Sequence, residues 1–303
     1  MQLPLQPRRI CTHVLSLGIL EAKHRTKKIM RHEEQFQGSA APDWRVGRME
    51  TDRAVFEYLE KLEPLLRADA NILRDKGFPV DERCRINPAE FGGGSEPVFS
   101  ETSIARDRQL VKARKEGKFE RGTETTDAMG ELLESTATIA FNELWFGGRL
   151  VKVRTAEYDD YIGGVDEFIV DTQTQEIIAA IDTTTVPDLK ALALRNNVNK
   201  GGAVKYGVAM DARGARKTDL ANLPYLVLSI PPKDLLPLAR VLVERKGAPQ
   251  ARELEARVLA QLIKETDVFA TEVADAAHRG QYRRLRAIFE EIQAVRARPE
   301  RVH

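Results

Sequence analysis

The 303-residue sequence is poor in the residues that hold small folds together, because it has only two cysteines and five histidines. Cys11 and Cys84 stand far apart without CxxC spacing, so neither a disulfide framework nor a structural zinc site is indicated. The chain also lacks an excess of either charge, with 47 basic against 46 acidic residues. Any attraction for an anionic partner must therefore come from a local patch rather than from the whole chain.

Long apolar runs are missing as well. No stretch approaches the roughly 20 apolar residues that a membrane helix needs, so we expect a soluble, cytoplasmic protein without a membrane partner. A stretch near the N-terminus, RRICTHVLSLGIL, has the paired arginines of a secretion signal, but Thr12 and His13 interrupt its apolar part. We therefore expect residues 1–35 to be a leader that is either disordered or included through a wrongly assigned start. In the second case Met30 is the true start.

Helical periodicity dominates both ends of the remaining chain, residues 36–122 and residues 233–303. Residues 51–76 predict an amphipathic helix, bent or broken at Pro64, with an apolar stripe made of Val55, Leu59, Leu62, Leu66 and Ile72. The proline- and glycine-rich residues 78–99 predict a loop and a candidate domain boundary. In the C-terminal extension the pattern predicts three helices, the last two separated near Gly280.

The middle of the chain, residues 123–232, changes from helical to strand periodicity. It begins with a helix that Gly147 and Gly148 end, and the buried face of this helix comprises Leu133, Ala137, Ala140, Phe141 and Leu144. Segments rich in β-branched residues then predict five strands, at residues 149–156, 164–171, 176–185, 203–210 and 223–231. A leucine and alanine stripe predicts a helix between the third and fourth of these strands, at residues 187–201. The expected core is therefore α/β, with the order helix, three strands, helix, two strands.

Two aspartates, Asp166 and Asp182, fall inside neighbouring apolar runs of this core. If the second and third strands form a hairpin, the paired residues are Phe168 with Ala180, Val170 with Ile178, and Asp166 with Asp182. Opposed like charges repel each other, unless a divalent cation such as Mg²⁺ lies between them. Either a metal site follows, or one aspartate ends its strand in solvent and the other caps a turn.

The residues around these aspartates resemble the PD-(D/E)XK nuclease superfamily, which has the restriction-endonuclease-like fold. The likeness rests on a helical glutamate, a YDD…GVD element, an IDTTT strand and a later VKY strand, and it covers about residues 129–231. The resemblance implies an αβββαβ core that hydrolyses phosphodiester bonds of DNA, or of RNA. It also implies that Asp166 and Asp182 hold Mg²⁺ or Mn²⁺ with support from Glu134, or from Glu131 three residues earlier.

The superfamily lysine is missing from its usual place, because this sequence has Thr184 there. The resemblance then implies that the lysine has moved to another element, where Lys205 of the VKY strand is the candidate and Lys190 and Lys200 are weaker ones. Two alternatives remain open. The chain is either a catalytically inactive nuclease-like domain that binds nucleic acid or protein, or a structural protein whose helical ends form an interface.

Other polar residues have two readings each. An acidic loop before the hairpin either adds a second metal site or is a solvated turn; its acids are Glu157, Asp159 and Asp160. Tyr158 and Tyr161 either stack on a nucleic-acid base or pack against the hairpin. The basic stretches Arg106–Arg121 and Arg279–Arg301 either follow phosphates or form solvated helix faces.

Overall fold

The structure is a computed structural model, and the chain divides into two units, Met1–Thr51 and Asp52–His303. The residues that it describes are 43–91, 99–119, 124–185, 202–211, 214–217, 220–246 and 248–297. The expected leader, Met30 and the helix expected at residues 187–201 lie outside these ranges. Apart from residues 43–51, the features that follow belong to the second unit.

The first long helix, α2 (Asp43–Asp75), contains the helix expected at residues 51–76. Pro64 lies inside it on the exposed side and does not end it, so the predicted break is wrong. Its buried stripe comprises Val55, Leu62, Leu66, Ala70 and Leu73. Ile72, expected in that stripe, is 51% exposed, because the helical period puts Leu73 rather than Ile72 in line with Leu66 and Ala70.

Residues 78–91, where a loop was expected, contribute to the same core as the helices. The short 3₁₀ turn η2 (Pro88–Glu90) lies in this segment, and the buried side chains are Phe78, Val80, Cys84, Ile86 and Phe91. Ile86 donates its N–H to the carbonyl of Arg154, and Arg154 donates its N–H to the carbonyl of Cys84, at 2.9 and 3.0 Å. The segment is therefore fixed against the edge strand β1 (Leu150–Arg154), and this places Arg85 beside Arg154.

Two further helices precede the sheet. Helix α3 (Glu101–Phe119) buries Ile104, Asp107 and Val111, which are about one and two turns apart. Helix α4 (Glu124–Ile139) continues into the π-helical turn η3 (Ala140–Leu144), and its buried side chains confirm the stripe expected from Leu133 to Phe141. The short turn η4 (Phe146–Gly148) then ends the helix with Gly147 and Gly148 at φ 58° and 74°, a conformation that glycine adopts without strain.

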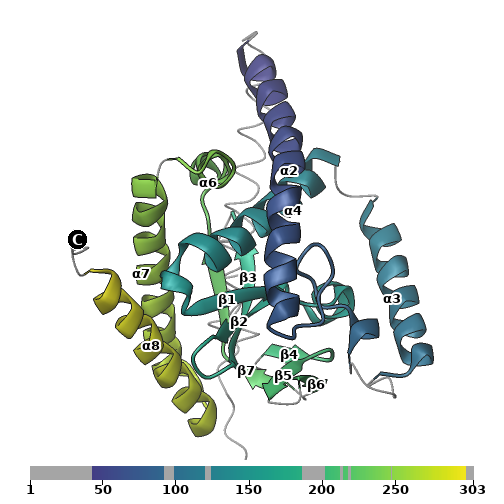
Figure 1. The fold of residues 1–303 in the computed structure, drawn as a ribbon, viewed down its shortest axis with the longest axis vertical. Coiled ribbons are helices and arrows are strands. Elements are labelled where there is room, and N and C mark those ends of the chain that lie inside the picture. The colour runs from purple at the N-terminus through teal and green to yellow at the C-terminus, as the bar shows by residue number, and fades with distance from the viewer. Residues whose placement is uncertain are drawn as a thin grey trace, which may run out of the picture. The chain divides into compact units, whose positions relative to one another are not determined.

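The central sheet has four strands in the order β1-β2-β3-β8, and Figure 1 labels the first three of them. Strands β1, β2 (Glu167–Asp171) and β3 (Glu176–Thr184) form an antiparallel meander, and β8 (Tyr225–Ser229) runs parallel to β3. The predicted pair of Phe168 with Ala180 is confirmed. The pair of Val170 with Ile178 is wrong, because a bulge leaves Ile178 as the extra residue and pairs Val170 with Ile177.

The fourth expected strand is split into two short ones. Strand β4 (Gly202–Val204) pairs with β7 (Leu220–Leu223), whereas β5 (Val208–Asp211) pairs with β6 (Gly214–Lys217). Lys205 lies in the turn between β4 and β5 and not on a strand. Gly207 follows in the same turn, and a glycine inside a strand pattern weakens the strand.

Three C-terminal helices complete the described fold: α6 (Pro232–Glu244), α7 (Ala248–Glu272) and α8 (Ala276–Arg296). Helices α7 and α8 lie side by side, and α7 also packs on β8 (Figure 1). The break between them comes before Asp275, whose side chain accepts the N–H of His278 at 2.7 Å, and not at Gly280, which lies inside α8. The fold is mixed α/β, and none of the helices in the described ranges is both long and apolar enough to cross a membrane.

Candidate functional site

Three polar side chains meet in the interior where β1, β2 and β3 lie under α4. The ammonium of Lys152 lies 2.7 Å from the carboxylate of Glu167, and both side chains are fully buried. Lys152 also donates to the hydroxyl of Thr183 at 2.9 Å, and that hydroxyl donates to Glu167 at 2.6 Å. Burial lowers the pKa of Lys152 and raises the pKa of Glu167, since both charged forms lose water. We call these three residues the buried triad.

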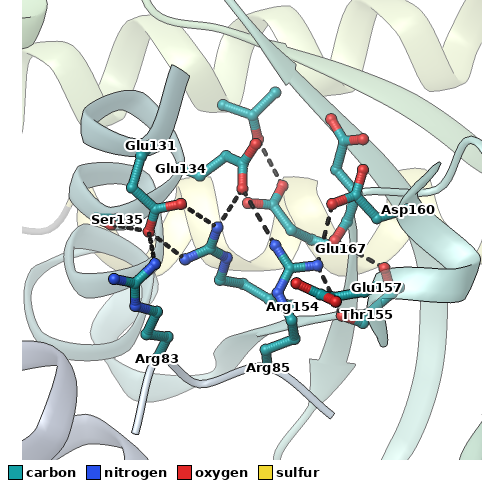
Figure 2. A network of polar contacts seen from close by, with 12 residues as sticks. Arg83, Arg85, Glu131, Glu134, Ser135, Arg154, Thr155, Glu157, Asp160 and Glu167 are labelled. Carbon is teal, nitrogen blue, oxygen red and sulfur yellow. Dashed lines mark hydrogen bonds and ion pairs between the residues drawn. The ribbon is translucent and has the colours of Figure 1, made fainter. Parts of the chain in front are cut away.

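Arg154 lies next to the buried triad and joins β1 to α4 (Figure 2). Its guanidinium donates to both oxygens of Glu131, at 2.8 and 3.0 Å, and to one oxygen of Glu134. Burial alone would raise the pKa of Glu131, but the hydrogen bonds and charge of Arg154 outweigh it and lower the pKa to about 2. Glu131 is therefore ionised over the whole physiological range.

Arg85 extends this network toward the turn η5 (Asp159–Gly163), as Figure 2 shows. It donates to Asp160 at 3.0 Å and to the carbonyl of Thr155 at 3.2 Å, and it lies 3.7 Å from Glu134. Burial raises the pKa of Asp160, although the charge of Arg85 opposes the rise. Asp160 is consequently an ion-paired residue and not part of a solvated turn.

A cleft opens over this network, bounded by α3, by residues 81–88 and by residues 154–161. We call it the α3 cleft; its volume is about 390 Å³. Its cationic side chains are Arg83, Arg85, Arg108, Lys115 and Arg154, and its acids are Asp81, Asp107, Glu131 and Glu157. Three tyrosines also line it, namely Tyr158, Tyr161 and Tyr206. The cleft thus combines hydrogen-bond donors, acceptors and aromatic rings.

Lys205, the expected catalytic lysine, is held against α3. Its ammonium contacts Asp107 and lies 3.4 Å from Ser103 and 4.7 Å from the ring centre of Tyr158. Asp159 accepts the backbone N–H of Lys205 at 2.7 Å and that of Tyr206 at 3.1 Å, and burial raises the pKa of Asp159 to about 6. These contacts fix the turn beside the α3 cleft.

The two expected metal-binding aspartates lie elsewhere on the sheet. The Glu167–Ile181 pair begins β2, and continuing this register by one residue places Asp166 opposite Asp182. Both side chains are half-buried, and the hydroxyl of Tyr225 donates to Asp182 at 3.3 Å. Glu167, one residue after Asp166, is fully buried, as is Asp171 at the other end of β2.

The residues that the resemblance assigns to Mg²⁺ do not all lie on one face of the sheet. Thr183 faces the side of α4, and side chains alternate along a strand, so the preceding Asp182 faces the opposite side. Glu134 belongs to the α4 side, where Arg154 and Arg85 surround it. Glu134 and Asp182 cannot share one ion in this arrangement, so the three expected ligands do not form a single metal site.

The sequence interpretation missed the buried triad and Arg154, although a signal was present. In LVKVR the two cations alternate with valines, so Lys152 and Arg154 lie on one face of β1. Lys152 pairs with Ile169 of β2, and Glu167 lies two positions before Ile169, on the same face. Charged residues at alternating positions of a buried strand need opposite charges on the same face. Lys190 and Lys200, the weaker lysine candidates, lie outside the described residues.

The basic stretches expected to follow phosphates divide between two settings. In the first stretch, Arg106–Arg121, Arg108 and Lys115 of α3 line the α3 cleft. In the second, arginines of α8 form ion pairs with acids of neighbouring elements, and the pairs are Arg284–Glu176, Arg286–Asp267 and Arg296–Glu255. The α3 cleft is therefore the better placed of the two for an anionic ligand.

Comparisons with known proteins return no relative: the sequence matches no family model, and no curated protein or solved structure matches it.

Proposed function

We propose that the chain is a restriction-endonuclease-like domain that binds nucleic acid in the α3 cleft. The observation that carries the proposal is the cleft itself. In it, exposed guanidinium groups and tyrosine rings lie together beside the ion pairs of the buried Arg154 with Glu131 and Glu134. Binding needs no metal, so it does not depend on bringing Glu134 and Asp182 together.

The order of the elements supports the fold that the resemblance implies. Helix α4 precedes the antiparallel strands β1, β2 and β3, and β8 then lies parallel to β3. A parallel neighbour requires a crossover connection, which here spans the residues between β3 and β8. This arrangement is what an αβββαβ core requires of its strands.

The chemistry of the cleft supports a phosphate-bearing ligand. The side chain of Arg83 is 66% exposed, and it lies 3.9 Å from Glu131, too far for a strong ion pair. Arg108 of α3 also lines the cleft and is exposed. Guanidinium groups bind phosphate through two parallel hydrogen bonds, and tyrosine rings give a base a surface for stacking.

The double variant Arg83→Ala/Arg108→Ala is expected to weaken nucleic-acid binding at least about 10-fold, since a hydrogen bond to a charged group contributes roughly 1.5 kcal/mol or more. The slope of log K against log salt concentration should fall by roughly 1.4–1.8, about 0.7–0.9 for each lost phosphate contact. Fluorescence anisotropy with labelled single-stranded and duplex oligonucleotides measures both quantities.

The matched control is Arg240→Ala/Arg286→Ala, which removes two exposed arginines from α6 and α8. It should bind like the wild type. If the two double variants bind equally well, or if the wild type binds neither oligonucleotide, the proposal is wrong.

Hydrolysis is a second candidate function, because the register of β2 and β3, continued one residue beyond the Glu167–Ile181 pair, would bring Asp166 opposite Asp182. The same oligonucleotides, incubated with Mg²⁺ or Mn²⁺ and separated on a denaturing gel, distinguish it from binding alone. Shortened strands with the wild type and intact strands with Asp182→Asn would favour hydrolysis. Intact strands with both proteins would favour a binding domain.

A further inference from the structure

We infer that the α3 cleft accommodates a single unpaired nucleotide, with its phosphate at the arginines and its base against a tyrosine ring, rather than a length of duplex. This inference rests on the proposed function and narrows the ligand to a nucleotide of a single strand or of a strand end. The charge, the size and the aromatic lining of the cleft each point to this ligand.

The charge of the cleft fits one or two phosphates and not a long backbone. Its five cations face four acids, so its formal charge is only +1. Three of the cations are already engaged: Arg154 with Glu131, Arg85 with Asp160, and Lys115 with Glu157. A protein that follows a duplex typically neutralises roughly 6–10 phosphates, and acids in the path of that backbone would repel it.

The size of the cleft fits a small ligand. Its volume of about 390 Å³ lies within the range of pockets that enclose small molecules, roughly 300–1,000 Å³. Helix α3 and residues 81–88 both line it, Arg108 from the helix and Arg83 from the loop. An unpaired nucleotide can enter between such walls, whereas paired bases remain inside their own helix.

The aromatic lining provides a position for the base. Tyr161 is half-buried in the wall of the cleft, and the ammonium of Lys115 lies 4.9 Å from its ring centre. The same ammonium lies 2.7 Å from Glu157, which is half exposed and accepts hydrogen bonds. A base stacked on Tyr161 would therefore lie near Glu157, an acceptor for its N–H groups.

The test compares adenosine 5′-monophosphate, adenosine, inorganic phosphate, a single-stranded oligonucleotide and its duplex. Adenosine 5′-monophosphate is expected to displace the labelled single strand, with adenosine and phosphate each at least about 10-fold weaker, because each lacks one half of the ligand. The single strand should bind more tightly than the duplex. Its salt dependence should have a slope of about one to two, far below that of a protein that follows a duplex.

Tyr161 is the residue whose replacement tests the stacking contact. Tyr161→Ala should weaken binding of the single strand at least roughly 5-fold, since stacking on one ring contributes that much or more. Tyr161→Phe keeps the ring and should bind like the wild type. The matched control is Tyr58→Ala on α2, because Tyr58 also carries a lysine over its ring, at 5.5 Å, but lies outside the cleft.

The outcomes separate this inference from the proposed function. Tighter binding of the duplex with a steep salt dependence, or no displacement by adenosine 5′-monophosphate, would overturn the single-nucleotide inference and leave nucleic-acid binding in place. Equal binding by Tyr161→Ala and Tyr161→Phe would overturn the stacking contact, and with it the inference. Binding of adenosine 5′-monophosphate without binding of any oligonucleotide would overturn the proposed function alone.

Discussion

Replacing Lys152 with methionine is expected to lower the free energy of unfolding by about 3–5 kcal/mol, because it leaves the carboxylate of Glu167 buried without its opposite charge. Both side chains are fully buried, and the ammonium and carboxylate lie 2.7 Å apart. Methionine resembles lysine in length, so the loss reports the charge and not a cavity. Urea unfolding followed by circular dichroism measures the change.

The matched double variant Lys152→Met/Glu167→Leu should recover most of the lost stability, since apolar residues of similar size often replace a buried ion pair without cost. If Lys152→Met is too unstable to purify, Thr183→Val removes one hydroxyl of the buried triad and should cost roughly 1–3 kcal/mol. A loss below about 1 kcal/mol in Lys152→Met would contradict a buried ion pair at this position.

Raising the pH from about 5 to about 8 is expected to destabilise the chain through Asp69 of α2. Burial, followed by the negative charge of Glu143, raises the pKa of Asp69 from 3.8 to about 8, although Arg245 opposes the rise. The folded chain therefore keeps a proton that the unfolded chain has released. The stabilisation is complete below pH 4 and is lost as the pH rises through 8, by at most about 1.4 kcal/mol per pH unit.

Asp69→Asn should remove this part of the pH dependence, because an amide stays neutral at every pH. The variant should lie closest to the wild type near pH 4 and should become the more stable of the two as the pH rises to 8. Asp75→Asn, at the exposed end of the same helix, is the control and should follow the wild type at both pH values. Parallel curves for the wild type and Asp69→Asn would show that Asp69 is not the group responsible.

Local patterns predicted much of the architecture. The helical stripe from Leu133 to Phe141 and the antiparallel pairing of Phe168 with Ala180 follow from periods of 3.6 and 2 residues, and both are present. The errors arise where a single residue changes the geometry. The bulge at Ile178 shifts one end of a register, and Gly207 interrupts a segment that otherwise has the composition of a strand.

The candidate site was harder to predict, because it depends on contacts between distant segments. Arg85 lies beside Asp160 because residues 84–86 form backbone hydrogen bonds with the edge strand β1. No periodic pattern in the sequence predicts that contact. The hairpin argument located the correct strands but selected Asp166 and Asp182, whereas the carboxylate that pairs with the buried Lys152 belongs to Glu167. A shift of one position moves a strand residue to the other face of the sheet.

Photo-crosslinking tests most directly whether the α3 cleft binds nucleic acid. A single-stranded oligonucleotide that carries 5-iodouracil, irradiated with the full-length chain and analysed by mass spectrometry of the peptides, reports which side chains touch a base. We expect crosslinks at the partly exposed tyrosines of the cleft, Tyr158 or Tyr161, and we expect Arg83→Ala/Arg108→Ala to reduce their yield. Crosslinks confined to α6 or α8, at the same yield in both proteins, would contradict the account.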